Sequence, residues 1–153
     1  MLDIKVFAVD PGITTGMAFY NPYAENNNDN ATIWTDEAKN DDEVLGIALE
    51  FDPDVVVVER FATSGQISKY GLSTVELVGA LYGLSYCMRQ NDYARGKWEF
   101  VRQTPQSRRS FMQDAIEHNG PSLHGRSTHK GRHERDALAH LLEYVWKAEN
   151  GRV

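Results

Sequence analysis

The sequence predicts one α/β domain spanning residues 1–153, in which a mixed β-sheet carries helices on both faces. Three observations support this fold class. Strand-length apolar segments alternate with helix-length amphipathic segments along the chain. Residues 55–58 are four consecutive valines, a pattern typical of a strand buried on both faces in a parallel part of a sheet. The length of 153 residues and the hydrophobic content of 41% suit a single core.

The first three strands are expected near the N-terminus. Residues 4–9 form an apolar strand that ends at the turn Asp10-Pro11-Gly12. Residues 16–20 and 32–35 form the next two strands, and the polar turn residues between them predict a hairpin. This hairpin is expected to extend the sheet from the first strand.

Helices and strands alternate in the remainder of the chain. Asp41 or Asp42 is expected to cap a helix that ends before Pro53. After the valine strand, a capping box that begins at Ser73 predicts a long helix ending near residue 91. Apolar residues cover most of its circumference, which predicts a central position. The remaining elements are a strand at residues 98–101, a helix from Thr104 to residue 118 and a last helix at residues 133–148.

Composition excludes several classes of protein. Cys87 is the only cysteine, which excludes an internal disulfide and suits a reducing cytoplasm, and we expect it to be a small core residue. No apolar segment approaches the roughly 18 residues of a membrane span. The N-terminus has no basic stretch before an apolar run, so it does not resemble a signal peptide. We expect a soluble cytoplasmic protein with no membrane partner.

Charge is divided unevenly along the chain, whose formal net charge is −6. Residues 1–58 carry 2 basic and 12 acidic side chains, whereas residues 95–135 carry 9 basic and 4 acidic ones. Because phosphate binding depends on local potential, a basic stretch inside an acidic protein indicates a polyanionic partner. A solvated Arg-rich loop is the alternative interpretation.

Three acids occupy positions that favour catalysis. Asp10 ends the first strand, Glu59 ends the valine strand, and Asp136 lies in the first turn of the last helix. In a sheet covered by helices, ligands bind beyond the carboxyl ends of the strands, so these acids are expected to meet there. Gathered carboxylates repel one another and need a cation, and oxygen ligands suit Mg²⁺ or Mn²⁺. Two such ions could activate water and stabilise a leaving oxygen in phosphodiester hydrolysis.

His133 is expected to join these acids, because it lies one helical turn before Asp136. It could bind the second cation or move a proton near the leaving oxygen. Each residue also has an ordinary structural interpretation. Asp10 could simply form a turn, Glu59 could pair with Arg60, and Asp136 could interact with the helix dipole.

Four segments, AVDPGITTG, VVVVERF, WEFVRQTPQSRRSF and HERDALAH, occur in an order and spacing that resemble the RuvC-type Holliday-junction resolvases of the ribonuclease H-like superfamily. The resemblance covers almost the whole chain, and its compact form looks like the resolvases carried by bacteriophages, which act in the host cytoplasm. It implies a five-stranded mixed sheet, a symmetric homodimer, Mg²⁺ dependence and paired nicks across a four-way DNA junction.

The resemblance also implies roles for single residues. Asp10, Glu59 and Asp136 match the three family acids, and His133 matches a position where members carry Asp or His. Phe61 matches an aromatic residue that inserts among bases at the junction centre, although it follows the acid by two residues rather than three. Basic residues near the predicted metal site are expected to contact DNA phosphates; they are Arg102, Arg108, Arg109, Arg126, Lys130, Arg132 and Arg135.

Three other functions are compatible with parts of the sequence. The segment from Asp10 to Gly16 resembles the phosphate-binding hairpin of actin-like ATPases, which need a second nucleotide-binding half. A non-catalytic junction-binding protein could share the fold. A restriction-enzyme core would use Asp54 with Glu59, but Phe61 stands where that core has lysine.

Two further features lie on the predicted helices. His140 faces the same side as Asp136 and is expected to be buried and hydrogen-bonded, with support of the acidic site as a second role. Gly79 and Gly83 would permit close approach of another backbone, within the subunit or across a dimer interface.

Overall fold

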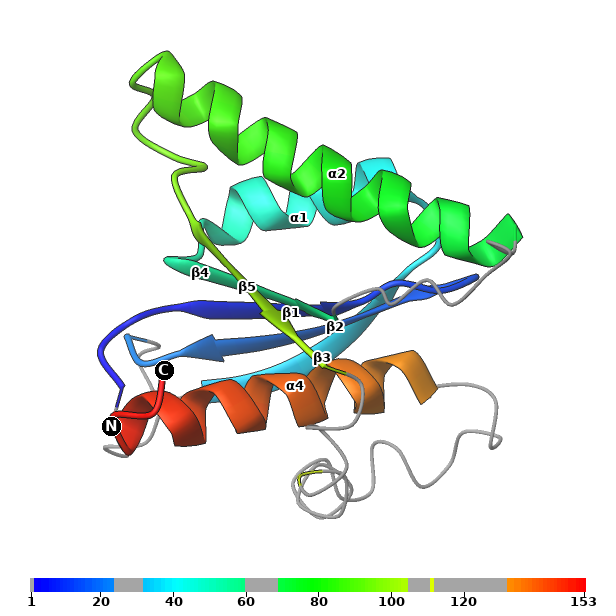
Figure 1. Cartoon of the computed structure of the whole chain (residues 1–153). Coiled ribbons are helices and arrows are strands. Elements are labelled where there is room, and N and C mark those ends of the chain that lie inside the picture. Colours follow the sequence, from blue (N-terminus) through cyan, green and yellow to red (C-terminus); the bar gives the residue numbers. More distant parts are fainter. Residues whose placement is uncertain (1, 24–31, 60–68, 105–110, 112–131) are drawn as a thin grey trace.

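A five-stranded mixed sheet with helices on both faces forms the framework of the protein (Figure 1), which confirms the predicted fold class. The computed structural model describes residues 2–23, 32–59, 69–104, 111 and 132–153. The strand order is β3-β2-β1-β4-β5. β1 pairs antiparallel with β2 and β2 with β3, whereas β1–β4 and β4–β5 are parallel. The strands are β1 (Val6–Asp10), β2 (Thr15–Asn21), β3 (Thr32–Ala38), β4 (Val55–Glu59) and β5 (Glu99–Gln103).

Three helices complete the described structure, and they cover opposite faces of the sheet. α1 (Asp41–Phe51) and α2 (Lys69–Gln90) lie on one face and α4 (Arg132–Glu149) lies on the other (Figure 1). None of the described helices has the length and apolarity needed to cross a bilayer. The helix predicted from Thr104 to residue 118 falls almost wholly outside the described residues.

The central strands divide their side chains between two cores. In β1, Val6 and Ala8 pack with residues of α4, whereas Phe7 and Val9 pack with residues of α1 and α2. The valines of β4 alternate in the same way, and all four are buried. The prediction that this strand is buried on both faces is therefore confirmed. The alternation has period two, so a residue's position in the strand determines which helix layer it faces.

α1 begins one residue earlier than the sequence predicted. Asn40, and not Asp41 or Asp42, is the N-cap, and its side-chain oxygen accepts a hydrogen bond from the Glu43 amide (2.9 Å). Asp41 and Asp42 instead occupy the first turn, where the helix dipole favours acids. The helix ends at Asp52, whose left-handed backbone (φ 51°) lets its amide bond to the Ala48 carbonyl.

α2 differs most from its prediction. It begins at Lys69 and not at the capping box predicted at Ser73. The helix is also not central, because Val75 (47% exposed) and Tyr86 (56% exposed) face away from the sheet. Cys87 is exposed as well, which contradicts its expected place in the core. The apolar residues around the helix therefore form one face toward the sheet and a second, uncovered face.

α4 lies across the sheet in nearly its predicted place. The helix starts at Arg132, so Asp136 stands in its second turn and not the first. Ala137, Leu138 and Leu141 are fully buried in the core formed with the even-numbered residues of β1 and β2 and the odd-numbered valines of β4. This packing fixes the helix over the carboxyl ends of the two central parallel strands.

Candidate active site at the ends of the central strands

Strand alternation places three polar residues on the face covered by α4. Asp10 is the last residue of β1 and shares the side of Val6 and Ala8. Glu59 ends β4 on the side of Val55 and Val57. Gln103 ends β5 and is the register partner of Glu59. Since Val9 pairs with Val58, Asp10 and Glu59 leave neighbouring parallel strands at the same edge, as the sequence predicted.

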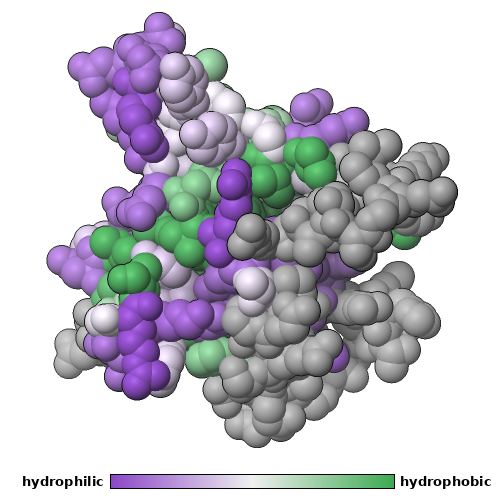
Figure 2. Space-filling view, viewed as in Figure 1, coloured by the Kyte–Doolittle hydropathy of each residue, from purple (hydrophilic) through white to green (hydrophobic). Residues whose placement is uncertain are grey.

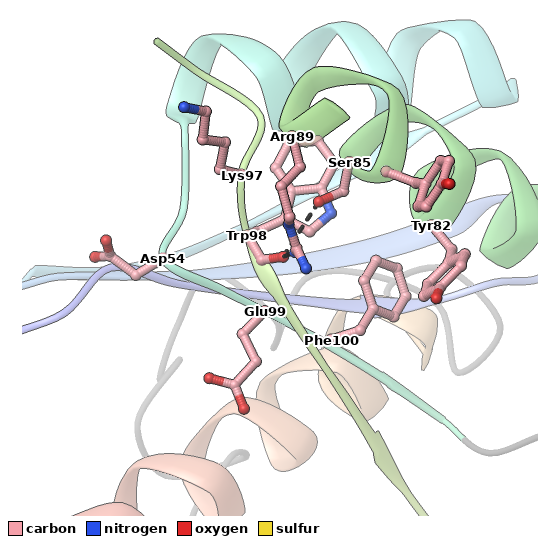
Figure 3. A pocket seen from close by; sticks show the side chains of 9 residues that line it. Asp54, Tyr82, Ser85, Arg89, Lys97, Trp98, Glu99 and Phe100 are labelled. Carbon is pink, nitrogen blue, oxygen red and sulfur yellow. Dashed lines mark hydrogen bonds between the residues drawn. The ribbon is translucent and has the colours of Figure 1, made fainter. Parts of the chain in front are cut away.

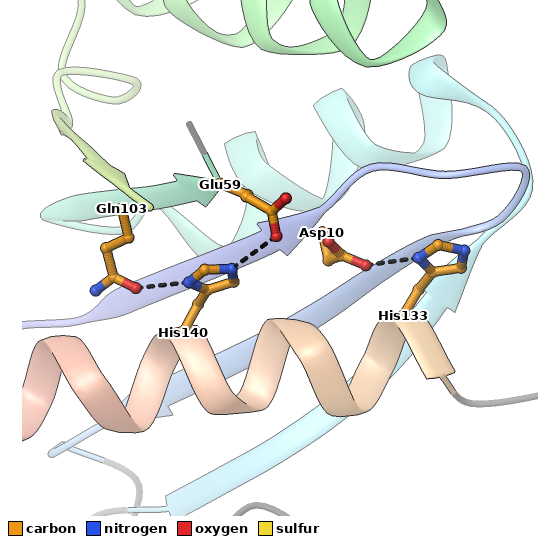
Figure 4. Close-up of polar contacts among 5 residues, drawn as sticks. All are labelled: Asp10, Glu59, Gln103, His133 and His140. Atoms are coloured by element: carbon orange, nitrogen blue, oxygen red, sulfur yellow. Dashed lines mark hydrogen bonds and ion pairs between the residues drawn. The ribbon is translucent and has the colours of Figure 1, made fainter. Parts of the chain in front are cut away.

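α4 presents a matching row of polar side chains to these strand ends. His133, Asp136 and His140 are spaced by three and four residues, which places them on one face of the helix. The His133 ring donates from Nδ1 to Oδ2 of Asp10 (2.5 Å), and His140 donates from Nε2 to Oε2 of Glu59 (3.2 Å) (Figure 4). Asp136 lies between the two histidines along the same face of the helix.

The carboxylates of this cluster are largely withdrawn from solvent. Asp10 and Asp136 are each 7% exposed, and the Glu59 side chain is 26% exposed. A buried carboxylate is costly unless hydrogen bonds or positive charge compensate for lost water. The histidine contacts provide part of that compensation for Asp10 and Glu59. The site therefore combines largely buried carboxylates with histidine side chains.

Two glycines let the start of α4 approach the strand ends. A methyl group built on Gly16 would lie 1.9 Å from the His133 carbonyl carbon, and one on Gly12 would lie 2.3 Å from the His133 ring. Gly16 is also the register partner of Asp10. The hairpin between β1 and β2 thus holds both the backbone and the ring of His133 beside Asp10.

The site has the donor chemistry of a magnesium centre without a finished coordination shell. Among the described residues, no three histidine, cysteine, aspartate or glutamate side chains come together closely enough to hold a metal ion as they stand. Asp10 and Glu59 are bound to histidines instead. Carboxylate oxygens with one imidazole nitrogen nevertheless fit Mg²⁺ or Mn²⁺ in kind. The four predicted metal ligands are thus brought to one end of the sheet, with their ligation left as a prediction.

The predicted DNA-binding residues are only partly described. Phe61, Arg108, Arg109, Arg126 and Lys130 lie outside the described residues. Arg132 opens α4, and Arg135 lies in its first turn with a buried Nε that has no hydrogen-bond partner among the described residues.

Arg102 is exposed on β5 and faces away from α4. It lines a hollow of about 350 Å³ with Glu59 and residues of α2, among them Tyr82. The hollow therefore connects the end of β4, on the side away from α4, with the uncovered face of α2.

A second hollow, of about 590 Å³, lies near the opposite end of β5 (Figure 3). There Ser85 Oγ and Arg89 Nη2 donate to the Trp98 carbonyl, at 3.2 and 2.8 Å. These contacts join α2 to the start of β5. Asp54 borders this hollow and also accepts a hydrogen bond from the Lys5 amide (2.7 Å). Asp54 and Glu59 thus occupy opposite ends of β4, which rules out their pairing in a restriction-type site.

Gln103 is the site residue that the sequence did not predict. Its side-chain amide hydrogen-bonds Nδ1 of His140 (2.7 Å), and His140 is fully buried. Its position at the end of a predicted strand was visible, but a glutamine there has no distinctive chemistry. The register of β4 and β5 is what makes it a neighbour of Glu59. The expectation that His140 is buried and hydrogen-bonded is confirmed.

The fold is that of Holliday-junction resolvases. No protein-family model and no curated protein matches the chain. Among solved structures, RuvC of Thermus thermophilus has a TM-score of 0.63 at 17% identity, over 97% of both chains. The Fowlpox virus resolvase has a TM-score of 0.62 at 13% identity, over 93% of this chain and 99% of that one. The yeast mitochondrial resolvase Ydc2 has a TM-score of 0.61 at 16% identity, over 96% of this chain and 81% of that one. The resemblance predicted from the sequence segments is therefore confirmed for the fold.

Proposed function

We propose that the protein is a metal-dependent endonuclease that resolves four-way DNA junctions by paired phosphodiester hydrolysis. One observation carries the proposal: Asp10 and Glu59 end neighbouring parallel strands at one edge of the sheet, where His133 and His140 of α4 contact them. Asp10 and Glu59 are each contacted by a histidine of α4. Such an arrangement favours a cation-dependent reaction over a purely structural role.

In this proposal Asp10, Glu59 and Asp136 hold Mg²⁺, and Mn²⁺ can replace it. When bound, a pair of such ions activates the attacking water and stabilises the leaving oxygen of the phosphodiester. His133 is 30% exposed and hydrogen-bonded to Asp10, so it can orient that carboxylate or complete the ligand set. Its second ring nitrogen can also carry a proton at the solvent side of the site.

Branched DNA is the proposed substrate because of the fold and the basic residues that precede α4 in the sequence. One T. thermophilus RuvC structure with this fold contains a Holliday-junction substrate, as does the Fowlpox virus resolvase structure. In this chain, residues 95–135 carry an excess of positive charge, and they lead directly into α4 and the acids. Phosphate contacts from these residues would position DNA without reading its sequence.

A homodimer is proposed through the uncovered face of α2. Val75, Gly79 and Tyr82 follow one another at helical spacing, and the row continues with Gly83 and Tyr86. Both tyrosines are more than half exposed, and a methyl group on either glycine would meet nothing within 4 Å. Figure 2 shows apolar side chains gathered between α2 and β5. Small residues beside aromatic ones suit a helix of a second copy, which would place two active sites on one junction.

The dimer proposal is tested by the mass of the protein in solution. Tyr82→Glu with Tyr86→Glu should convert a dimer into a folded monomer in sedimentation equilibrium, because two buried charges would oppose association. Tyr93→Glu, at an exposed tyrosine just beyond α2, is the matched control. A wild-type monomer at micromolar concentration would overturn the proposal.

The function is tested by cutting a panel of labelled DNAs. Four-way, three-way and linear duplexes should be incubated with Mg²⁺ or with EDTA, and the cut positions read on every strand. We expect paired nicks in the four-way junction, slower cutting of three-way DNA, none in the linear duplex and none with EDTA. Junction binding without nicking would leave a non-catalytic binding protein, and ATP hydrolysis without nicking would indicate the actin-like alternative. The bacteriophage origin and cytoplasmic location stay predictions.

A further inference from the structure

The fully buried side chain of His140 connects the ends of two strands to α4. It occupies the same helix face as Asp136, one turn further along. A residue with no exposure cannot complete its hydrogen bonds with solvent, so both ring nitrogens need partners in the protein. Nδ1 lies 2.7 Å from Gln103 Oε1 and Nε2 lies 3.2 Å from Glu59 Oε2. Both ring nitrogens therefore have partners, Gln103 at the end of β5 and Glu59 at the end of β4.

The register of β4 and β5 determines which two residues the His140 side chain bridges. Glu59 and Gln103 are partners in the parallel β4–β5 pair, so their side chains stand next to each other on the α4 face. His140 contacts both of them (Figure 4). With the Gln103 side-chain amide hydrogen-bonded to Nδ1, the ring is held in one orientation, and its Nε2 is directed at Glu59. Gln103 thus determines how the ring is placed, and the ring determines how the carboxylate is placed.

The bridge engages one oxygen of Glu59 on the side of α4. The second carboxylate oxygen points away from His140 (Figure 4). The Glu59 side chain is 26% exposed and also lines the hollow that Arg102 borders. A hydrogen bond to a carboxylate limits its rotation and reduces the entropy lost when the carboxylate binds an ion.

We propose that His140, held by Gln103, is a positioning residue that orients Glu59 for metal binding. This inference rests on the proposed function, because it gives Glu59 the role of a metal ligand. His140 itself contacts neither DNA nor the ion. Removing its hydrogen bond should weaken metal binding by about 10- to 100-fold, the range found when residues that orient metal ligands are lost.

The test uses direct metal binding as well as cleavage by the full-length protein. Mn²⁺ binding should be measured by isothermal titration calorimetry, and the Mg²⁺ concentration for half-maximal junction cleavage should be measured in parallel. His140→Leu removes the donor at similar volume, and His140→Gln retains an amide donor. Leu141→Val is the matched control, since Leu141 is fully buried on the same helix but belongs to the apolar core.

We expect His140→Leu to raise the dissociation constant for Mn²⁺ and the Mg²⁺ concentration for half-maximal cleavage about 10- to 100-fold. The cleavage rate at saturating Mg²⁺ should change less. His140→Gln should recover most of the affinity, and Leu141→Val should bind metal like the wild type. Gln103→Leu, on a different element, should raise the same two quantities. It replaces His140→Leu in the test if that variant does not fold. Wild-type metal affinity in the folded His140→Leu or Gln103→Leu protein would overturn the positioning role while leaving the nuclease intact. A wild type that binds no Mn²⁺ and cuts no junction would overturn both.

Discussion

Replacing Gly16 with alanine should displace the start of α4 from the sheet. The added carbon would lie 1.9 Å from the His133 carbonyl carbon, 2.0 Å from its oxygen and 2.3 Å from the Glu134 nitrogen. Carbon atoms in contact are about 3.5–4.0 Å apart, so the helix start must move by roughly 1.6–2.1 Å. The obstructing atoms are all backbone, and no side-chain rotation can relieve the overlap.

This displacement should reduce both stability and activity. Overpacking of this kind costs about 1–3 kcal/mol, and for a domain of this size each kcal/mol lowers Tm by roughly 2–4 °C. We therefore expect a fall in Tm of about 2–12 °C. Because His133 and Asp136 move with the helix, junction cleavage should also fall by roughly 10²-fold in the folded protein.

The matched control is Gly46→Ala in α1, where an added methyl group meets nothing within 4 Å. Alanine favours a helix over glycine by about 0.8–1.0 kcal/mol, so this variant should be slightly more stable than the wild type. Calorimetry measures both Tm values, and a single-turnover assay at a temperature well below them measures cleavage. Wild-type stability and cleavage in Gly16→Ala would refute the close approach of α4 to the hairpin.

Two further predictions concern the frame around the site. Asn40→Ala should lower the free energy of unfolding by about 0.5–2 kcal/mol in urea titrations, because Asn40 and not Asp41 caps α1; an equal loss from Asp41→Ala alone would contradict this assignment. Burial, with the negative charge of Glu99 nearby, raises the pKa of Tyr144 above its ordinary value of 10.0. The unfolded phenol ionises first, so the stability from Tyr144 is complete below the ordinary pKa and is lost as pH rises through the raised one. Tyr144→Phe should lessen the fall in unfolding free energy between pH 9 and pH 11, and an identical fall in both proteins would contradict it.

The sequence was sufficient for those parts of the fold that depend on strong local patterns. Four adjacent valines predicted a strand buried on both faces, and the β4 valines indeed divide between two cores. Asp10 and Glu59 could be placed together because both end strands that the pattern made parallel neighbours. Period-two alternation then fixes their side chains on the α4 face, a consequence that needs only the strand boundaries.

Tertiary contacts decided the features that the sequence did not predict. Ser73 has the local chemistry of a cap, but α2 already continues from Lys69, so the helix does not begin at Ser73. Cys87 is apolar enough for a core, yet it lies on the uncovered part of the helix. Gln103 became a site residue only through its register with Glu59 and the packing of His140. Single-residue patterns do not encode such long-range pairings.

The most direct test of the central claim is junction cleavage by proteins in which each acid is made neutral without a change of size. Asp10→Asn, Glu59→Gln and Asp136→Asn should each bind a labelled four-way junction as the wild type does and produce no nicks in Mg²⁺. Asp36→Asn, at an exposed acid on β3, should cut normally. Near wild-type cutting by any of the first three would contradict a shared cation site formed by these carboxylates.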